Sequence, residues 1–160
     1  MSKFPLNDVG DFLTGNDGCA SANSGAPSLI TAGGALDNVK VTGQAVDRKS
    51  GSAISYSAFI QTAYLAALSD TKSLTLAHEY QDSADNSTWN TAVVIEAATT
   101  KATSDGGTNE RGVDVHKLSL LALDRYVRVN VTPDLTATGT DTCLFFTVIT
   151  LGGWSQVPQS

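Results

Sequence analysis

The two histidines are the side chains of this sequence that would most readily bind a metal ion or transfer a proton. His78 and Glu79 begin an HExxH zinc motif, but residue 82 is aspartate, so the motif is incomplete. A zinc site needs three or four converging ligands. His78, His116 and Cys143 are the available donors, and no spacing rule brings them together. We therefore predict no metal site and no cofactor.

Nucleophilic catalysis finds little support in the sequence. Ser69 to Lys72 fit the S-x-x-K pattern, but no K-T-G follows and the segment is typical of a turn rather than of a helix start. The sequence contains no G-x-S-x-G elbow, P-loop or G-x-G-x-x-G motif. A small hydrolase that uses Glu79 or Glu96 as a scattered carboxylate stays open as an alternative. We predict a protein without catalytic residues.

The composition indicates one domain with few charges. The chain has 160 residues, of which 41% are hydrophobic and 16% charged, and its formal net charge is −6. This length suffices for one hydrophobic core without crosslinks. Cys19 and Cys143 are expected to be free thiols, and Cys143, inside an apolar run, a small core residue.

The charge and the apolar runs also bear on partners. The acidic balance argues against a nucleic-acid partner, which usually needs a basic face. No apolar run reaches the roughly 18 residues of a membrane span. The N-terminus lacks the apolar centre of a signal peptide. We therefore expect synthesis in a cytoplasm and no membrane partner.

The elements that must position these side chains are short β-type runs that begin after residue 37. In residues 125–132, the valines at 127, 129 and 131 face inward and Arg128 and Asn130 outward, and Pro133 is expected to end the strand. Other expected strands include residues 39–42, 53–69, 74–80, 89–98, 113–123 and 143–151, and a long polar loop is expected over residues 99–109. About seven to eight strands without intervening helices predict an all-β fold, an antiparallel β-sandwich or jelly roll.

The first 36 residues differ from the rest of the chain. A short apolar cluster precedes a stretch rich in glycine, serine, alanine and asparagine, which is typical of a loop or an extended arm. We predict an N-terminal arm over residues 1–36 and a sandwich domain over residues 37–160. The arm must dock either on its own domain or on a neighbouring subunit, and Phe4, Leu6 and Phe12 are its expected anchors.

The aromatic side chains allow two interpretations. Trp and Tyr at strand positions usually pack in the core or on a sheet face. The alternative is a sugar-binding platform in which Trp89 or Trp154 stacks on a glycan. Trp154 follows the last strand and a glycine pair, and is expected either to close the end of its own sandwich or to anchor a contact with a neighbour.

Two segments in the second half of the chain have a distinctive order of strands and turns. They are SLTLAHEYQDSADNSTWNTA and LDRYVRVNVTPDLTATGTDTCLFFTVITLGG. The first leads from a strand into a "DS-D-ST-W" turn, and the second joins a "RYVRV-VTP" strand, a Thr/Gly/Asp loop and a last strand that closes in LGG. Together, over residues 72–153, they resemble small structural proteins of tailed bacteriophage virions.

The resemblance implies a virion component, most often a capsid decoration (cement) protein with a jelly-roll fold. It implies as partners the major capsid protein of the phage head and further copies of this chain, in a homodimer or homotrimer. The expected location is the capsid exterior, after synthesis in the host bacterial cytoplasm. A phage tail or baseplate component and a host-surface, glycan-binding module stay open as alternatives.

Overall fold

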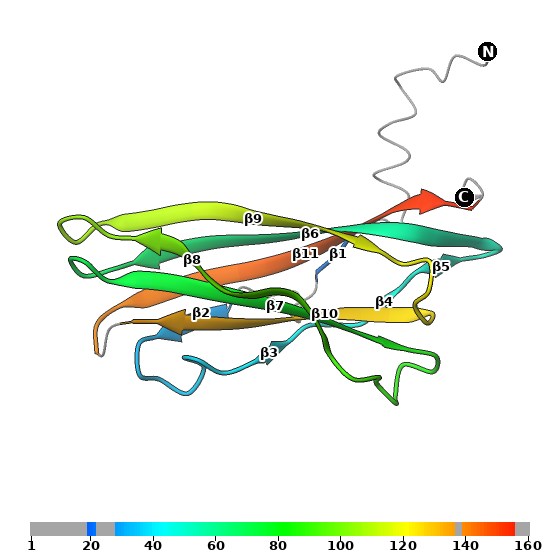
Figure 1. Ribbon diagram of the computed structural model, residues 1–160, viewed down its shortest axis with the longest axis horizontal. Coiled ribbons are helices and arrows are strands. Elements are labelled where there is room, and N and C mark those ends of the chain that lie inside the picture. The colour runs from blue at the N-terminus through cyan, green and yellow to red at the C-terminus, as the bar shows by residue number, and fades with distance from the viewer. Residues whose placement is uncertain (1–18, 22–27, 137–138, 156–160) are drawn as a thin grey trace, which may run out of the picture.

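The computed structural model describes residues 19–21, 28–136 and 139–155. All regular structure in these ranges is β-strand, and the strands form two antiparallel sheets that face each other (Figure 1). The strands are β1 (Cys19–Ser21), β2 (Ser28–Thr31), β3 (Val41–Thr42), β4 (Val46–Asp47), β5 (Lys49–Ser50), β6 (Ala53–Ala67), β7 (Ser73–Ser83), β8 (Val93–Thr103), β9 (Asn109–Ser119), β10 (Tyr126–Leu135) and β11 (Thr142–Trp154). Within the described ranges, no helix has the length and apolar character that a membrane crossing requires.

The strand order is that of a jelly roll. In the first sheet, β11 lies between β6 and the short strands β1 and β2, and β6 pairs on its other side with β9 and β5. In the second sheet the order is β3 and β4, then β10, β7 and β8. Strands from the start and the end of the chain therefore pair in both sheets, β2 with β11 and both β3 and β4 with β10, as in a jelly roll. The predicted fold class is confirmed.

β6 and β11 form the long central pair of the first sheet. Successive side chains of a strand point to opposite faces, and the two strands alternate between buried and exposed residues. Ile60 and Phe145 are fully buried, whereas Phe59 and Phe146 are 43% and 42% exposed. The strands predicted over residues 53–69 and 143–151 are thus present, and the first sheet has an apolar outer face as well as an apolar inner one.

The hydrophobic core fills the space between the two sheets. Its fully buried large side chains come from both sheets, and they are Ile30, Ile60, Leu74, Leu76, Leu120, Val127, Val129, Val131, Phe145, Ile149 and Leu151. Each such side chain stabilises the fold by roughly 1.5–3 kcal/mol through burial. Cys143 is a free, buried thiol in this core, and burial raises its pKa to about 12.

The C-terminal part of the predicted arm belongs to the sandwich. β2 pairs with the start of β11, where Ile30 lies opposite Cys143 and is fully buried. The segment's overall composition concealed this strand, because two adjacent apolar residues, Leu29 and Ile30, are enough to cover the core edge. β1 also pairs with β11, so strands of the sandwich already occur before residue 37, within the segment predicted as an arm.

The polar segment predicted as a loop over residues 99–109 is mostly strand. β8 continues to Thr103 and β9 starts at Asn109, so the connection is confined to residues 104–108. Gly106 and Gly107 adopt φ angles of 80° and 74° there, a conformation that favours glycine. The threonines before the turn suit an edge strand, which β8 is in the second sheet.

Pro133 lies inside β10 instead of ending it. Its carbonyl accepts a hydrogen bond from the Asn38 N–H, on the side of β10 away from β7. The nitrogen of a strand residue points the same way as its carbonyl, so the missing N–H costs no ladder bond to β7. Asn130, predicted to face outward, is 1% exposed, and its Nδ2 donates to Gln81 Oε1 at 3.0 Å.

Candidate functional site

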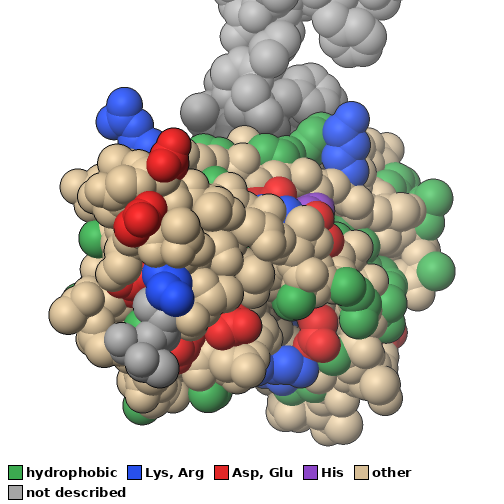
Figure 2. All heavy atoms as spheres, turned by 60° about the vertical axis from the view of Figure 1, so that its left-hand side comes forward, with side chains coloured by type: hydrophobic (Ala, Val, Ile, Leu, Met, Phe, Trp, Pro, Cys, Tyr) green, Lys and Arg blue, Asp and Glu red, His purple; other side chains and the backbone are tan. Residues whose placement is uncertain are grey.

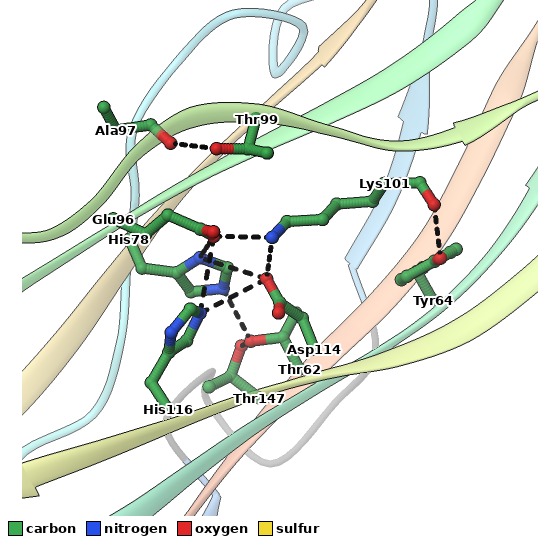
Figure 3. Close-up of polar contacts among 10 residues, drawn as sticks. All are labelled: Thr62, Tyr64, His78, Glu96, Ala97, Thr99, Lys101, Asp114, His116 and Thr147. Carbon is green, nitrogen blue, oxygen red and sulfur yellow. Dashed lines mark hydrogen bonds and ion pairs between the residues drawn. The ribbon is translucent and has the colours of Figure 1, made fainter.

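Three strands bring histidines, carboxylates and a lysine together between the sheets, on the side where β8 and β9 approach each other. Figure 3 shows these side chains pointing toward one another. We call this group the polar cluster; it consists of His78 from β7, Glu96 and Lys101 from β8, and Asp114 and His116 from β9. Asp114 and His116 are two residues apart in a strand, so both point to the inner face.

Irregular pairing explains how β8 contributes two side chains five residues apart. In a regular strand, Glu96 and Lys101 would point to opposite faces. The register between β7 and β8 shifts between Leu74 and Thr75, where Lys101 has no partner, and again on both sides of the pair His78–Glu96. Such β-bulges re-aim side chains, and here they direct both Glu96 and Lys101 into the space between the sheets.

The polar atoms of the cluster lie close together. Lys101 Nζ is 2.6 Å from Glu96 Oε2 and 2.7 Å from Asp114 Oδ2. His116 Nε2 lies 3.2 Å from Asp114 Oδ2 and 3.6 Å from Glu96 Oε2. The corresponding distances from His78 Nδ1 are 3.7 Å and 3.8 Å. Each of the two histidines and two carboxylates therefore offers one nitrogen or oxygen atom, and these four atoms all lie within 4.8 Å of one another.

On the side of the ring that faces away from the cluster, His78 contacts a chain of two hydroxyl groups. Its Nε2 lies 3.0 Å from Thr62 Oγ1, which lies 2.9 Å from Thr147 Oγ1. All three side chains are fully buried. The opposite ring nitrogen, Nδ1, faces the cluster and has no hydrogen-bond partner among the described residues. Burial, reinforced by the neighbouring His116, lowers the pKa of His78 to about 4, so its imidazole is neutral at physiological pH.

The contact between Lys101 and the carboxylates of the cluster shifts the pKa values of both Lys101 and Asp114. Burial alone would raise the pKa of Asp114, but the hydrogen bond from Lys101 and the nearby histidines outweigh it, and the pKa is lowered. Burial likewise opposes the charge on Lys101, yet its bonds to Asp114 and Glu96 raise its pKa. The ion pair between Lys101 and Asp114 is therefore favoured in its charged form at neutral pH.

The cluster is reachable from outside. His116, Lys101 and Asp114 are 12–14% exposed, and Glu96 is 28% exposed. Figure 2 shows a small histidine surface bordered by acidic and basic atoms on one face of the molecule. A small ion can thus approach the cluster from solvent.

The structure brings together two of the three metal donors considered from the sequence. His78 and His116 have ring centroids 4.6 Å apart, but Cys143 is not among the clustered donors. The sequence reasoning missed the contributions of Glu96 and Asp114 to this group. The alternation Asp114-Val115-His116 on a strand was the one available signal, since it places two donors on one face.

The other candidate residues lie elsewhere. Phe4, Leu6 and Phe12 fall outside the described residues. Trp154, at the end of β11 and opposite Ser55, is half-buried and packs against the core. Glu79 follows His78 in β7, so its side chain points to the opposite face of the sheet, where it pairs with Lys40 at 2.5 Å instead of with Glu96.

Trp89, the other candidate for glycan stacking, already has a ring partner. The Arg128 guanidinium lies over the indole, 4.0 Å from the ring centroid. This cation–π contact covers one face of the ring that a sugar would need. The geometry at Trp89 therefore does not favour a glycan platform.

A second feature is the outer face of the first sheet. Cross-strand neighbours align Leu29, Leu144 and Leu65 in one row over β2, β11 and β6, and Phe146, Ala63 and Val113 in another over β11, β6 and β9. We call this surface the apolar face; its large side chains, 38–61% exposed, are Leu29, Phe59, Leu65, Val113, Val115, Leu144 and Phe146.

No protein-family model and no curated protein matches the sequence. Similar solved structures include the infectious bursal disease virus VP2 subviral particle, with 8% identity and a TM-score of 0.47 over 84% of this chain and 32% of that chain. The T13 particle of the same virus has 9% identity and a TM-score of 0.47, over 84% and 31% of the two chains. The CBM22-1–GH10 modules of Clostridium thermocellum xylanase 10B, complexed with xylohexaose, have 19% identity and a TM-score of 0.35, over 90% and 28%.

The chain thus spans about a third of the length of the viral chains that it matches. At these values of identity and TM-score, the likeness assigns no function to the chain.

Proposed function

We propose that this chain is a non-enzymatic structural component of a phage virion, a capsid decoration (cement) protein that associates with further copies of itself and binds the major capsid protein on the shell exterior. The apolar face is the observation that carries this proposal. Single exposed apolar side chains are ordinary, but seven large ones on adjacent strands of one sheet form a contiguous patch typical of an interaction surface.

A second copy of this chain is the proposed occupant of the apolar face. The patch lies on the long central strands β6 and β11 and their neighbours, and no charged side chain lies among the rows of apolar residues that these strands and β9 align. Arg111 and Lys117 lie at its border, on β9. An apolar centre with a charged rim is the usual anatomy of a protein interface, and a two-fold contact lets the same patch serve both subunits.

The resemblance of residues 72–153 to tailed-phage virion proteins supports the choice of a capsid partner. The N-terminal residues Phe4, Leu6 and Phe12 are the proposed contacts with the capsid, and Trp154 is a further proposed contact with a neighbouring subunit.

Self-association is tested by placing a charge in the centre of the apolar face. Phe146→Glu should weaken self-association at least tenfold, about 1.4 kcal/mol, because the carboxylate would be desolvated against the second copy. Val94→Glu is the matched control, since Val94 is 60% exposed but lies on the second sheet. Sedimentation velocity over a concentration series measures the effect. A monomeric wild type, or equal association of Phe146→Glu and wild type, would contradict the proposed interface.

Capsid binding is tested separately. Deletion of residues 1–18, which leaves β1 and the described sandwich intact, should abolish co-sedimentation with purified shells lacking this protein. The alternative of a tail or baseplate component is distinguished by copy number in purified virions, because a decoration protein is present at many copies per shell and a tail component at few. Unchanged shell binding by the shortened chain would remove the proposed role of the arm.

A further inference from the structure

We propose that His78, Glu96, Asp114 and His116 form a binding site for a first-row divalent metal ion, for which Zn²⁺ is the best match, and that the ion links β7, β8 and β9 across the two sheets. The inference concerns the interior of the sandwich and is independent of the proposed function. The donor set of two imidazoles and two carboxylates suits zinc among the common cellular cations, because calcium and magnesium prefer all-oxygen ligands.

The distances between the donors are close to those of a zinc site. Zinc binds imidazole nitrogen and carboxylate oxygen at about 2.0–2.2 Å, which places tetrahedral ligands about 3.3 Å from one another. The four histidine–carboxylate distances in the cluster are 3.2, 3.6, 3.7 and 3.8 Å. These pairs need to close by about 0.5 Å at most to reach tetrahedral spacing. All four donor atoms lie within 4.8 Å of one another, so the remaining two pairs, between the histidines and between the carboxylates, need to close by about 1.5 Å at most.

The orphaned nitrogen of His78 is the second, independent observation. Buried polar atoms almost always have a partner, yet Nδ1 of the fully buried His78 has none in the part of the chain that the structure describes, and it points into the cluster. Both carboxylate oxygens are too far from it for a hydrogen bond, at 3.7 Å and 3.8 Å. A metal ion between these atoms would satisfy the nitrogen directly.

The hydroxyl group of Thr62 favours the tautomer of His78 that can bind a metal ion through Nδ1. When Nε2 carries the proton and donates to Thr62, the lone pair lies on Nδ1, which faces the cluster. Thr62 can then donate to Thr147. Such outer partners fix the tautomer and the orientation of metal-binding histidines.

The ion pairs of Lys101 offer an alternative explanation of the cluster, because its ammonium contacts both carboxylates and no metal ion is then needed to hold them together. They leave the Nδ1 atom of His78 unpaired among the described residues, however. A carboxylate oxygen has two lone pairs, so Glu96 and Asp114 can each bind an ion and still accept a hydrogen bond from Lys101. The two carboxylates and one ammonium give the cluster a formal net negative charge, which attracts a divalent cation.

The test uses the full chain, stripped with EDTA, in a Cys19→Ser background so that this thiol does not bind the probe. ZnCl₂ is titrated by calorimetry and the melting temperature is followed in parallel. We expect saturation at one zinc per chain and a melting temperature that rises with zinc concentration, because an ion that binds only the folded state stabilises it. Co²⁺ should give the strong visible absorption of a tetrahedral site. Absence of saturable zinc binding to the wild-type chain would overturn the proposal.

Ligand variants identify the site. His116→Ala and Asp114→Asn should each weaken zinc binding at least tenfold, whereas Glu110→Gln, a matched carboxylate change on the same strand, should leave it unchanged. Lys101→Met separates the two explanations: the metal-free protein should be destabilised, and zinc should restore its melting temperature. Zinc binding equally to wild type, His116→Ala and Asp114→Asn would place the ion elsewhere and refute the site. If either ligand variant fails to fold, the titration and the cobalt spectrum of the wild-type chain still decide.

Discussion

The space between the two sheets has an apolar side and a polar side, and the two are held together differently. Toward β2, β10 and β11 the facing side chains are aliphatic or aromatic, as at Ile30, Val129 and Phe145, and they are fully buried. Toward β8 and β9 the same space holds the polar cluster, with Thr62 and Thr147 behind it. Hydrophobic burial is non-directional, whereas hydrogen bonds and ion pairs require fixed distances.

The apolar side and the polar side therefore have separate roles, the first in stability and the second in strand register. The apolar side accounts for most of the stability, because each buried large side chain contributes roughly 1.5–3 kcal/mol. The polar side contributes little net stability, since the desolvation of charges offsets their attraction. Its value lies in fixing the register of the bulged edge strand β8, and removing one of the clustered side chains leaves the others uncompensated. The two sides should therefore respond differently to mutation and to pH.

The largest effect is expected on the apolar side. Phe145→Ala should lower the free energy of unfolding by about 3–5 kcal/mol, because it removes a fully buried ring and leaves a cavity in the core. Phe146→Ala is the matched control, one residue further along β11 on the outer face and 42% exposed. Urea denaturation of both variants below the concentration at which the chain self-associates gives the comparison. Similar losses for the two variants would show that the inner face does not dominate stability.

The polar side should make stability depend on pH. In the metal-free protein, the folded pKa of His78 is lowered to about 4 by burial and by His116, whereas an unfolded histidine titrates near 6.5. Between these values the unfolded chain binds a proton that the folded chain excludes, so stability falls as the pH decreases through this window. The loss should approach about 3 kcal/mol below pH 4. The lowered pKa of Asp114 acts in the same direction at still lower pH.

Urea denaturation in EDTA at several pH values between 7 and 4 measures this dependence. Glu96, Asp114 and Lys101 face His78 together with His116, and all stay in place in the variant His78→Gln. That variant should lose most of the slope between pH 6.5 and 4. An unchanged slope would mean that His78 is not the group responsible.

The apolar side is the part of the molecule that the sequence predicts well. Alternating valines in β10 and the apolar run of β11 give the strands, their inner faces and the sandwich class, because burial of one face imposes a period of two. The boundaries were less well predicted. β2 lies in a segment dominated by small residues, and the end of β8 consists of threonines and a lysine that are equally common in loops.

The polar cluster could not be predicted from the sequence, for a specific reason. Its members come from three strands, and two of them, Glu96 and Lys101, point inward only because β-bulges interrupt the alternation of β8. A periodicity of two places them on opposite faces. Nothing in the local sequence shows which residues of β8 remain unpaired, since that depends on the register with β7.

The smallest effect on stability is expected from a change at Tyr64, which lies between the apolar side and the polar side and contacts both. Its ring packs against the core, and its hydroxyl donates to the Lys101 carbonyl at 2.8 Å. Lys101 has no partner in β7, so this hydroxyl satisfies a carbonyl that the bulge frees from the ladder. The phenol lies directly over Gly112, where any Cβ would collide with it. Glycine at this position thus allows the contact between β6 and β8.

Tyr64→Phe should therefore cost about 1 kcal/mol, the usual contribution of one hydrogen bond, while Tyr56→Phe, which changes a more exposed tyrosine on the same strand, should cost less. Amide hydrogen exchange adds the structural test. If Tyr64 fixes the bulge, its loss should speed exchange in β8 and leave β11 protected. Uniform acceleration over both strands would instead show that the two sides of the sandwich open as one unit, and that the polar side has no separate role in holding β8.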